Sequence, residues 1–254
     1  FDRDRLVDRM LLEKITNVLS HRGPDGSGFY CKDNIALGHR RLSIIDLSTG
    51  DQPMFNSDKS LAVVFNGEIY NYMELRDELK RLGYKFNTNS DTEVILKAYE
   101  EWGVNCQNKF NGMWAFAIWD EKKKYLFISR DRIGEKPLCY STYDNTFVFG
   151  SEIKSIIAYG IVATPNFELT ELYLSLGYIP APYSFYKNIS KLQAGHYLLV
   201  SENSVQEKKY WDLPDIDEGN MLMDKKQVYT TFEDLFKDSV RIRMRSDVPY
   251  GAFL

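Results

Sequence analysis

Apolar and polar residues alternate along the chain with two different periods, and the period separates predicted helices from predicted strands. Apolar residues at helical spacing predict helices over residues 5–19, 72–82, 91–102 and 227–245. Short β-type segments recur between them, and turn residues at 120–122 and 143–145 predict two hairpins. Antiparallel strands grouped between helices indicate sheets sandwiched by helix layers rather than a regular βαβ alternation.

The predicted helix over 91–102 is expected to be amphipathic. Its apolar face includes Val94, Ile95 and Ala98. The opposite, polar face is expected to carry Glu93, Lys97, Glu100 and Glu101.

The character of the sequence changes after about residue 200. Residues 212–226 are acidic, irregular and punctuated by Pro and Gly, which is typical of a linker. We therefore predict a first domain over 1–205, a linker over 206–226 and the truncated start of a second domain over 227–254. The final residues, SDVPYGAFL, indicate a buried strand at the end of the chain.

The composition argues against several classes of function. The 254 residues carry 32 basic and 36 acidic side chains without a basic tract, which argues against nucleic acid as a partner. No apolar run is long enough to span a membrane. The three cysteines have no metal-ligand spacing, so no metal site is predicted and a reducing, cytoplasmic location is expected.

A candidate binding site lies where an apolar run of five residues, starting at position 61, turns polar. Asn66 offers an amide donor, Gly67 a backbone N–H without a neighbouring Cβ, and Glu68 a carboxylate, at what we expect to be the end of a buried strand. Arg41 could form a bidentate contact with a carboxylate, and Asp91 could provide a second acceptor for an ammonium. Together these groups suit an amino acid as ligand.

Each residue alone has an ordinary structural interpretation. Asn66-Gly67 is the composition of a plain turn. Arg41 could form a surface ion pair, and Asp91 could be the N-cap of the following helix.

The combination of motifs resembles the class II glutamine amidotransferases, and is most similar to asparagine synthetases that hydrolyse glutamine. The segments that carry the resemblance are HRGPDGSG (21–28), GHRRLSIIDLSTGDQPM (38–54), FNGEIYNY (65–72), NSDTEVIL (89–96), FNGMWAFAIWD (110–120), SRDRIGEKPLCY (129–140) and GSEIKSI (150–156).

The resemblance implies an α+β fold, a four-layer αββα N-terminal-nucleophile sandwich of antiparallel sheets, followed by the start of an α/β synthetase domain. The first domain would free ammonia from glutamine, and the second would use ATP and Mg to activate aspartate for asparagine synthesis. A homodimer is compatible with this assignment. The alternatives are a related amidotransferase with another acceptor, such as a sugar or antibiotic precursor, and a non-catalytic glutamine-binding domain.

The resemblance also implies roles for individual residues. Arg41 would hold the α-carboxylate of glutamine, Glu68 and Asp91 its α-ammonium, and the Asn66 amide with the Gly67 N–H would form the oxyanion hole. The remaining residues expected at binding sites are Leu42, Ser43, Ile44 and Ile45 in the glutamine pocket wall, Asn71 nearby, and Leu254 against the adenosine part of ATP.

His21 lies in the first motif and invites a role as a catalytic base. The resemblance argues against that role, because in this family the loop closes the glutamine site and the base is the α-amino group of the nucleophile. His39 and His196 are interpreted as structural residues.

The nucleophile expected from the family is a cysteine at the start of the mature chain, whereas this sequence begins Phe1-Asp2-Arg3. The usual Cys-Gly-Ile start and its short strand would precede Phe1. Cys31, Cys106 and Cys139 are internal and lack a free amine, so the chain as given is expected to have a substrate pocket and no nucleophile.

The 254-residue polypeptide should therefore release no ammonia from glutamine above background, because the covalent route requires the missing thiol. A coupled assay for glutamate formation measures this directly. Turnover by the purified chain would show that another residue performs the chemistry.

Overall fold

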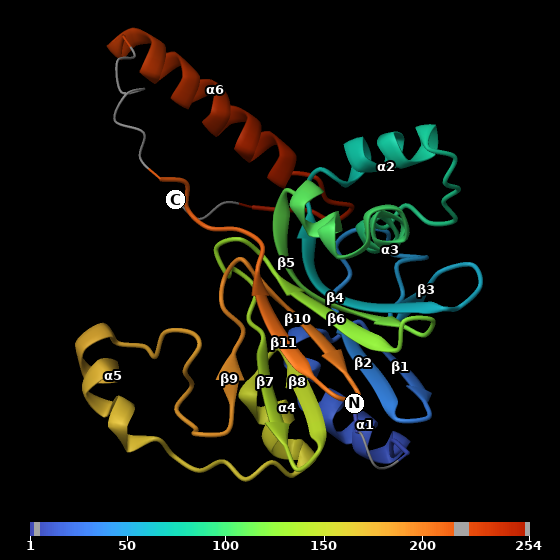
Figure 1. Cartoon of the computed structure of the whole chain (residues 1–254). Helices are drawn as coiled ribbons and strands as arrows, with labels where there is room; N and C mark the ends of the chain where they lie inside the picture. Colours follow the sequence, from blue (N-terminus) through green and yellow to red (C-terminus); the bar gives the residue numbers. More distant parts are fainter. Residues whose placement is uncertain (3–5, 216–223, 252–254) are drawn as a thin grey trace.

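The chain folds into four layers in the order helices, sheet, sheet, helices (Figure 1). The structure, a computed structural model, describes residues 1–2, 6–215 and 224–251. Its helices are α1 Arg9–Asn17, α2 Tyr72–Arg81, α3 Asp91–Trp102, α4 Ile153–Tyr159, α5 Thr170–Leu176 and α6 Lys225–Arg243, with 3-10 turns η1 Ser20–Arg22, η2 Gly103–Lys109 and η3 Phe167–Leu169. Its strands are β1 Gly26–Lys32, β2 Ile35–Arg41, β3 Met54–Phe55, β4 Leu61–Ile69, β5 Gly112–Asp120, β6 Tyr125–Arg130, β7 Cys139–Tyr143, β8 Thr146–Gly150, β9 Ser190–Lys191, β10 His196–Ser201 and β11 Val205–Lys209.

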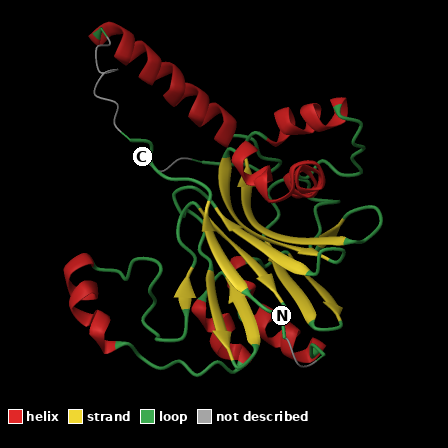
Figure 2. Ribbon diagram, viewed as in Figure 1, coloured by secondary structure: helices red, strands yellow, loops and turns green. Residues whose placement is uncertain are grey.

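The larger sheet has the strand order β11-β10-β6-β5-β4-β3, and helices α2 and α3 cover its outer face. The other sheet layer consists of two pieces, β1-β2 and β8-β7-β9, and helices α1 and α4 pack on its far side (Figure 2). All the strand pairs within these sheets are antiparallel. The predicted four-layer αββα sandwich is confirmed.

Three apolar cores separate the four layers, and strand alternation decides which residues enter each core. On β4, Val63 and Phe65 point toward α2 and α3, whereas Ala62 and Val64 point into the space between the sheets. The neighbouring strand β5 alternates in the same way. Even-numbered positions of β4 therefore face the second sheet, and this face continues to Asn66 and Glu68.

The predicted hairpins are confirmed, because β5 pairs with β6 and β7 pairs with β8. The helices expected at 5–19, 72–82, 91–102 and 227–245 correspond to α1, α2, α3 and α6.

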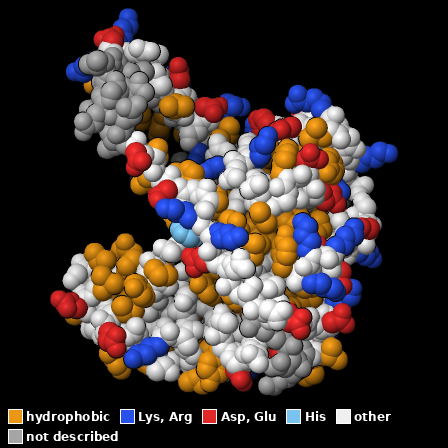
Figure 3. Space-filling view, viewed as in Figure 1, with side chains coloured by type: hydrophobic (Ala, Val, Ile, Leu, Met, Phe, Trp, Pro, Cys, Tyr) orange, Lys and Arg blue, Asp and Glu red, His pale blue; other side chains and the backbone are white. Residues whose placement is uncertain are grey.

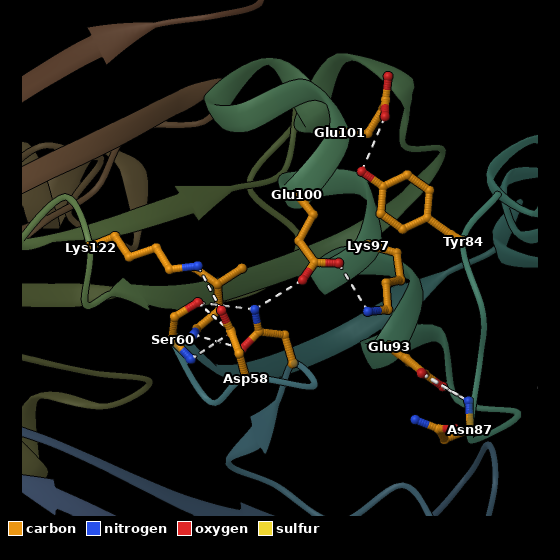
Figure 4. Close-up of polar contacts among 11 residues, drawn as sticks. Asp58, Ser60, Tyr84, Asn87, Glu93, Lys97, Glu100, Glu101 and Lys122 are labelled. Carbon is orange, nitrogen blue, oxygen red and sulfur yellow. Dashed lines mark hydrogen bonds and ion pairs between the residues drawn. The ribbon is translucent and has the colours of Figure 1, made fainter. Parts of the chain in front are cut away.

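The expectation of a polar, accessible face on α3 was wrong at two positions. Glu93 and Lys97 are buried together with their apolar neighbours. Figure 4 shows why burial is tolerated there: Glu93 reaches Asn87 and Lys97 pairs with Glu100. The Glu93 carboxylate accepts the backbone N–H groups of Asn87 at 3.0 Å and Thr88 at 2.7 Å, so tertiary contacts satisfy charges that periodicity places on the outside.

The predicted domain boundary at 205/206 falls inside regular structure. Strand β11 crosses it and pairs with β10 along its whole length, so residues 206–209 of the predicted linker lie in the larger sheet. Helix α6 begins at Lys225, and the described residues after it, 244–251, contain no strand.

Candidate functional site

A cavity of about 320 Å³ is lined by β4 and β5 of the larger sheet, by β2 and β8 of the other sheet layer, and by helices α1 and α4. Its lining contains eight of the ten residues predicted to bind glutamine, namely Arg41, Leu42, Ile44, Ile45, Asn66, Gly67, Glu68 and Asp91. These residues come from β2, the turn after it, β4 and the start of α3, so the fold brings together groups that are up to 50 positions apart in the sequence.

Strand β4 does not end at Asn66, which corrects the expectation from the sequence. It continues to Ile69, and Asn66, Gly67 and Glu68 pair with Ala115, Trp114 and Met113 of β5. The interpretation of Asn66-Gly67 as a plain turn is therefore wrong. The Asn66 Nδ2 group is buried and has no hydrogen-bond partner among the described residues, which is costly for an amide unless a ligand or water accepts from it.

Gly67 permits this strand to carry polar groups and still pair closely with β5. Its φ is +156°, and a Cβ at this position would lie 2.0 Å from the Met113 carbonyl oxygen. Any other residue would push the two strands apart. The backbone of β4 can therefore approach a bound molecule without a side chain in between.

Arg41 supplies positive charge to the cavity. Its guanidinium is nearly buried and forms an ion pair with Asp51 at 2.9 Å, while NH2 donates to the Asp46 carbonyl. The Nε–H group makes no hydrogen bond within the described part of the chain, so a donor remains for a ligand carboxylate. The ion pair predicted as an alternative exists, and it joins a nearly buried guanidinium to the exposed carboxylate of Asp51.

Glu68 and Asp91 supply negative charge to the same cavity. Ser90, one position earlier, is the N-cap of α3, so the N-cap interpretation of Asp91 is wrong. The Asp91 Oδ2 atom accepts the backbone N–H of Ile69 at 3.0 Å. Burial raises the pKa of the Asp91 carboxyl to about 7, and the charge of Glu68 adds to the rise. Burial also raises the pKa of Glu68. A bound cation would relieve both effects.

The loop of the first motif closes over this end of β2. The Arg40 Nε donates to the Gly23 carbonyl at 3.0 Å, and the Asp25 N–H donates to the Arg41 carbonyl at 3.0 Å. His21 is exposed and pairs with Glu152 at 2.9 Å, outside the cavity lining. The structure thus gives the loop a shaping role and keeps His21 away from the cavity.

The family described as "Glutamine amidotransferase domain" matches residues 3–211. The chain belongs to this family.

Two curated relatives extend the comparison. The chain is 42% identical to a putative glutamine-hydrolysing asparagine synthetase 2 of Methanocaldococcus jannaschii, covering 96% of this chain and 51% of the relative. It is 36% identical to a glutamine-hydrolysing asparagine synthetase 1 of Bacillus subtilis, covering 96% of this chain and 38% of that protein. The chain thus spans about half of the length of the first relative and 38% of the second.

A solved structure supports the fold. The glutamine phosphoribosylpyrophosphate amidotransferase of Bacillus subtilis superposes with a TM-score of 0.61 at 19% identity, covering 82% of this chain and 48% of that one. At this identity the likeness shows the fold alone, and it agrees with the layered sandwich.

Two residues predicted at the site lie outside the lining of the cavity. Ser43 donates its backbone N–H to the Asp25 carboxylate at 2.8 Å. Asn71 precedes α2, where its amide donates to the Lys109 carbonyl and accepts from the Asn111 N–H. Its amide oxygen and nitrogen therefore join α2 to the loop before β5. Leu254 lies outside the described residues.

Two residues that line the cavity were not predicted from the sequence. Gln52 lines the cavity and accepts the Phe65 N–H at 2.6 Å, which ties the β3 region to β4. Lys136 also lines the cavity, and its charge opposes the rise in the pKa of Glu68. Both residues fall within motifs that carried the family resemblance, which is the signal that could have identified them.

The three cysteines are poor nucleophiles in this environment. Burial raises the pKa of Cys31, Cys106 and Cys139, so their thiolates are disfavoured. None of the three lines the cavity. Their positions agree with the expectation that the nucleophile is not an internal cysteine.

His39 lines the cavity, and its Nδ1 atom is buried without a hydrogen-bond partner among the described residues, so its interpretation as a structural residue stays a prediction. Its Nε2 lies 3.1 Å from the Phe65 carbonyl, and burial lowers its pKa to about 4. His196 contacts the Ala194 carbonyl at 2.8 Å. Across the described residues, no cluster of three or more His, Cys, Asp or Glu side chains could hold a metal ion, and no helix is long and apolar enough to cross a membrane.

The buried acidic pair should make stability depend on pH at Asp91. Its pKa rises from 3.8 in the unfolded chain to about 7 in the fold, so Asp91 lowers the free energy of unfolding progressively as pH rises through this window. Asp91→Asn should raise the free energy of unfolding by about 3 kcal/mol more at pH 8 than at pH 4.5. Urea unfolding at both pH values measures the effect.

Asp77→Asn, an exposed site on α2, is the control and should show no such difference. Equal effects of Asp91→Asn at the two pH values would contradict the assignment of a costly buried charge.

Proposed function

We propose that this domain hydrolyses glutamine and passes the ammonia to a synthetase domain that converts ATP-activated aspartate into asparagine. The observation that carries the proposal is the buried, unpartnered Nδ2 group of Asn66, which lines one cavity together with Arg41 and the Glu68–Asp91 pair. A cation, two carboxylates and a neutral donor in one cavity match the carboxylate, ammonium and carboxamide of glutamine.

The charged groups would orient the substrate. Arg41 would bind the α-carboxylate through donors that its contacts with Asp46 and Asp51 leave available. Glu68 and Asp91 would bind the α-ammonium, which restores the ionised state that burial opposes at Asp91. Leu42, Ile44 and Ile45 would form the pocket wall, with Ser43 acting through the loop at Asp25.

Asn66 and Gly67 would form the oxyanion hole. A thiolate, formed when the α-amino group of the same residue takes the thiol proton, would attack the carboxamide carbon, and negative charge would develop on the carbonyl oxygen. The same proton would pass to the nitrogen as the C–N bond breaks, so that ammonia leaves. Water hydrolyses the resulting thioester to glutamate and the free thiol. The Asn66 amide and the Gly67 N–H would stabilise the oxyanion, a contribution on the order of 3 kcal/mol for one donor.

The first residues of the chain support a strand between β2 and β8 as the source of the thiol. Phe1 exchanges both backbone hydrogen bonds with Phe147 of β8, at 2.9 and 2.8 Å, and the Asp2 N–H donates to the Asn34 carbonyl beside β2. Continuing this antiparallel register before Phe1 leads along β8 toward Gly150, which lines the cavity. A cysteine at the start of such a strand would approach Asn66.

The proposal of a partner domain is based on the relatives and on the exposed apolar side chains of helix α6. Apolar residues of α6 are exposed at Tyr229, Phe232, Leu235 and Phe236, whereas Ile242 near its end is buried. Such exposure is expected of a helix whose own domain lies elsewhere. Hydrophobic side chains also gather over α5, at lower left in Figure 3. We propose that the domain starting at 227 binds ATP and Mg, with Leu254 at its adenosine site, and that aspartate is the acceptor. A different acceptor is the main alternative.

Asn66 provides the sharpest test. In a chain with its N-terminal cysteine present, Asn66→Ala should lower kcat for glutamine hydrolysis by roughly 100- to 1000-fold and change KM much less, because the donor acts in the transition state. Asn66→Gly and Asn66→Asp, with melting temperatures for each, separate catalysis from folding. Wild-type hydrolysis by the Gly variant would rule out the oxyanion role.

Arg41 tests the substrate end of the site in the full-length protein. Arg41→Ala should raise KM for glutamine by about 100-fold through loss of a charge-assisted contact, while synthesis from added ammonia remains at the wild-type rate. An equal fall in ammonia-dependent synthesis would assign Arg41 to folding instead.

A further inference from the structure

The segment that follows α6 returns to the amidotransferase body and contacts it through charged side chains. Arg245 donates to both carboxylate oxygens of Glu74, at 2.6 and 2.5 Å, and to the Tyr70 carbonyl. The Arg243 guanidinium lies 4.7 Å from the centre of the Tyr70 ring. Tyr70 directly follows β4, two residues after Glu68, so the segment is anchored beside the acidic end of the cavity.

Asp247 makes the second part of this contact, on the turn that follows β2. Its carboxylate accepts the Asp46 N–H at 2.8 Å, and its own N–H donates to the Ile44 carbonyl at 3.0 Å. Ile44 lines the cavity. Two hydrogen bonds, one in each direction, therefore fix the turn around Asp46, which lies 201 positions from Asp247 in the sequence.

Asp46 has a left-handed backbone conformation that its hydrogen bonds support. Its φ is +53°, in a region that glycine favours and that Asp adopts more readily than most other residues. Its side chain accepts from the backbone N–H groups of Thr49 at 2.9 Å and Asn89 at 2.7 Å. The Asp46 carbonyl accepts from NH2 of Arg41. The residue thus touches the basic side of the cavity and the loop that leads to Asp91.

The residues around Arg41 leave little space for its guanidinium to lie in another position. A Cβ on Gly50 would lie 2.5 Å from Arg41 NH2, so the turn fits closely around the guanidinium. If Asp46 relaxed from its left-handed conformation, its carbonyl would turn and Arg41 would lose this acceptor. The position of Arg41 therefore depends on the turn that Asp247 holds.

We propose that Asp247 and Arg245 are positioning residues, which make glutamine affinity depend on whether segment 243–248 is docked on the amidotransferase body. This inference rests on the proposed function, because it takes Arg41 as the carboxylate-binding group. Docking stabilises the turn at Asp46 and holds Arg41 ready for substrate. By thermodynamic linkage, bound glutamine favours docking of the segment to the same extent, so a domain attached beyond α6 senses occupancy of the site.

The test uses the full-length protein with its N-terminal cysteine. Asp247→Ala should raise KM for glutamine about ten-fold and leave kcat within about two-fold, because it removes one charge-assisted hydrogen bond that acts on binding. Asp247→Asn keeps an acceptor oxygen and should retain KM close to wild type. Glu233→Ala is the matched control, since that exposed carboxylate pairs with Lys237 on the same helix.

The double variant Arg41→Ala/Asp247→Ala separates positioning from general destabilisation. If Asp247 acts through Arg41, the double variant should have the same KM as Arg41→Ala alone. Additive effects of the two changes, or a KM for Asp247→Ala equal to that of Glu233→Ala, would overturn the inference. Melting temperatures of all variants detect any that fail to fold. If Asp247→Ala does not fold, Asp247→Leu, which also removes the acceptor oxygens, replaces it with the same expected rise in KM.

If the proposed function itself is wrong, the variants give a different pattern of KM values for glutamine. If Arg41→Ala itself leaves KM for glutamine unchanged, the glutamine site is misassigned and the inference falls with it. If Arg41→Ala raises KM while Asp247→Ala does not, the site stands and only the positioning role is rejected.

Discussion

The pairing of β4 with β5 through Asn66, Gly67 and Glu68 is the constraint on which the site depends. The ladder runs from Leu61 opposite Asp120 to Ile69 opposite Gly112. Because the strand does not break, alternation keeps Asn66 and Glu68 on the face that Ala62 and Val64 use to build the core between the sheets. Gly67 makes this geometry accessible, since only a residue without Cβ tolerates the Met113 carbonyl at that position.

The same alternation places polar side chains in the interior, where burial without a partner costs free energy. The Asn66 amide nitrogen is left without a partner among the described residues, and burial opposes ionisation of Asp91. A ligand with an acceptor oxygen and an ammonium would remove both costs, because the oxygen would accept from Asn66 and the ammonium would pair with Asp91. A site that is unfavourable when empty and complementary when filled is the arrangement expected of preorganised catalysis.

Asp46 connects the residues of the cavity to the segment that follows α6. It has a left-handed φ, is heavily hydrogen-bonded and contacts Arg41 and Thr49 in its own stretch of sequence as well as the distant residues Asn89 and Asp247. Arg245 adds a second contact beside β4. The basic and acidic sides of the cavity are therefore each tied to the segment after α6, although neither Arg245 nor Asp247 lines the cavity.

The sequence by itself determined the elements, the layered fold and the family, because apolar periodicity, turn residues and ordered motifs are local signals. It also pointed to eight residues that line one cavity. Tertiary structure alone decided that β4 continues through Asn66, since pairing with β5 overrides the turn preference of Asn-Gly. It also decided that Glu93 and Lys97 are buried, because loop N–H groups and Glu100 satisfy them, and that Asn71 holds a loop. The contact of Asp247 with Asp46 spans 201 positions, and no local pattern encodes a hydrogen bond across that separation.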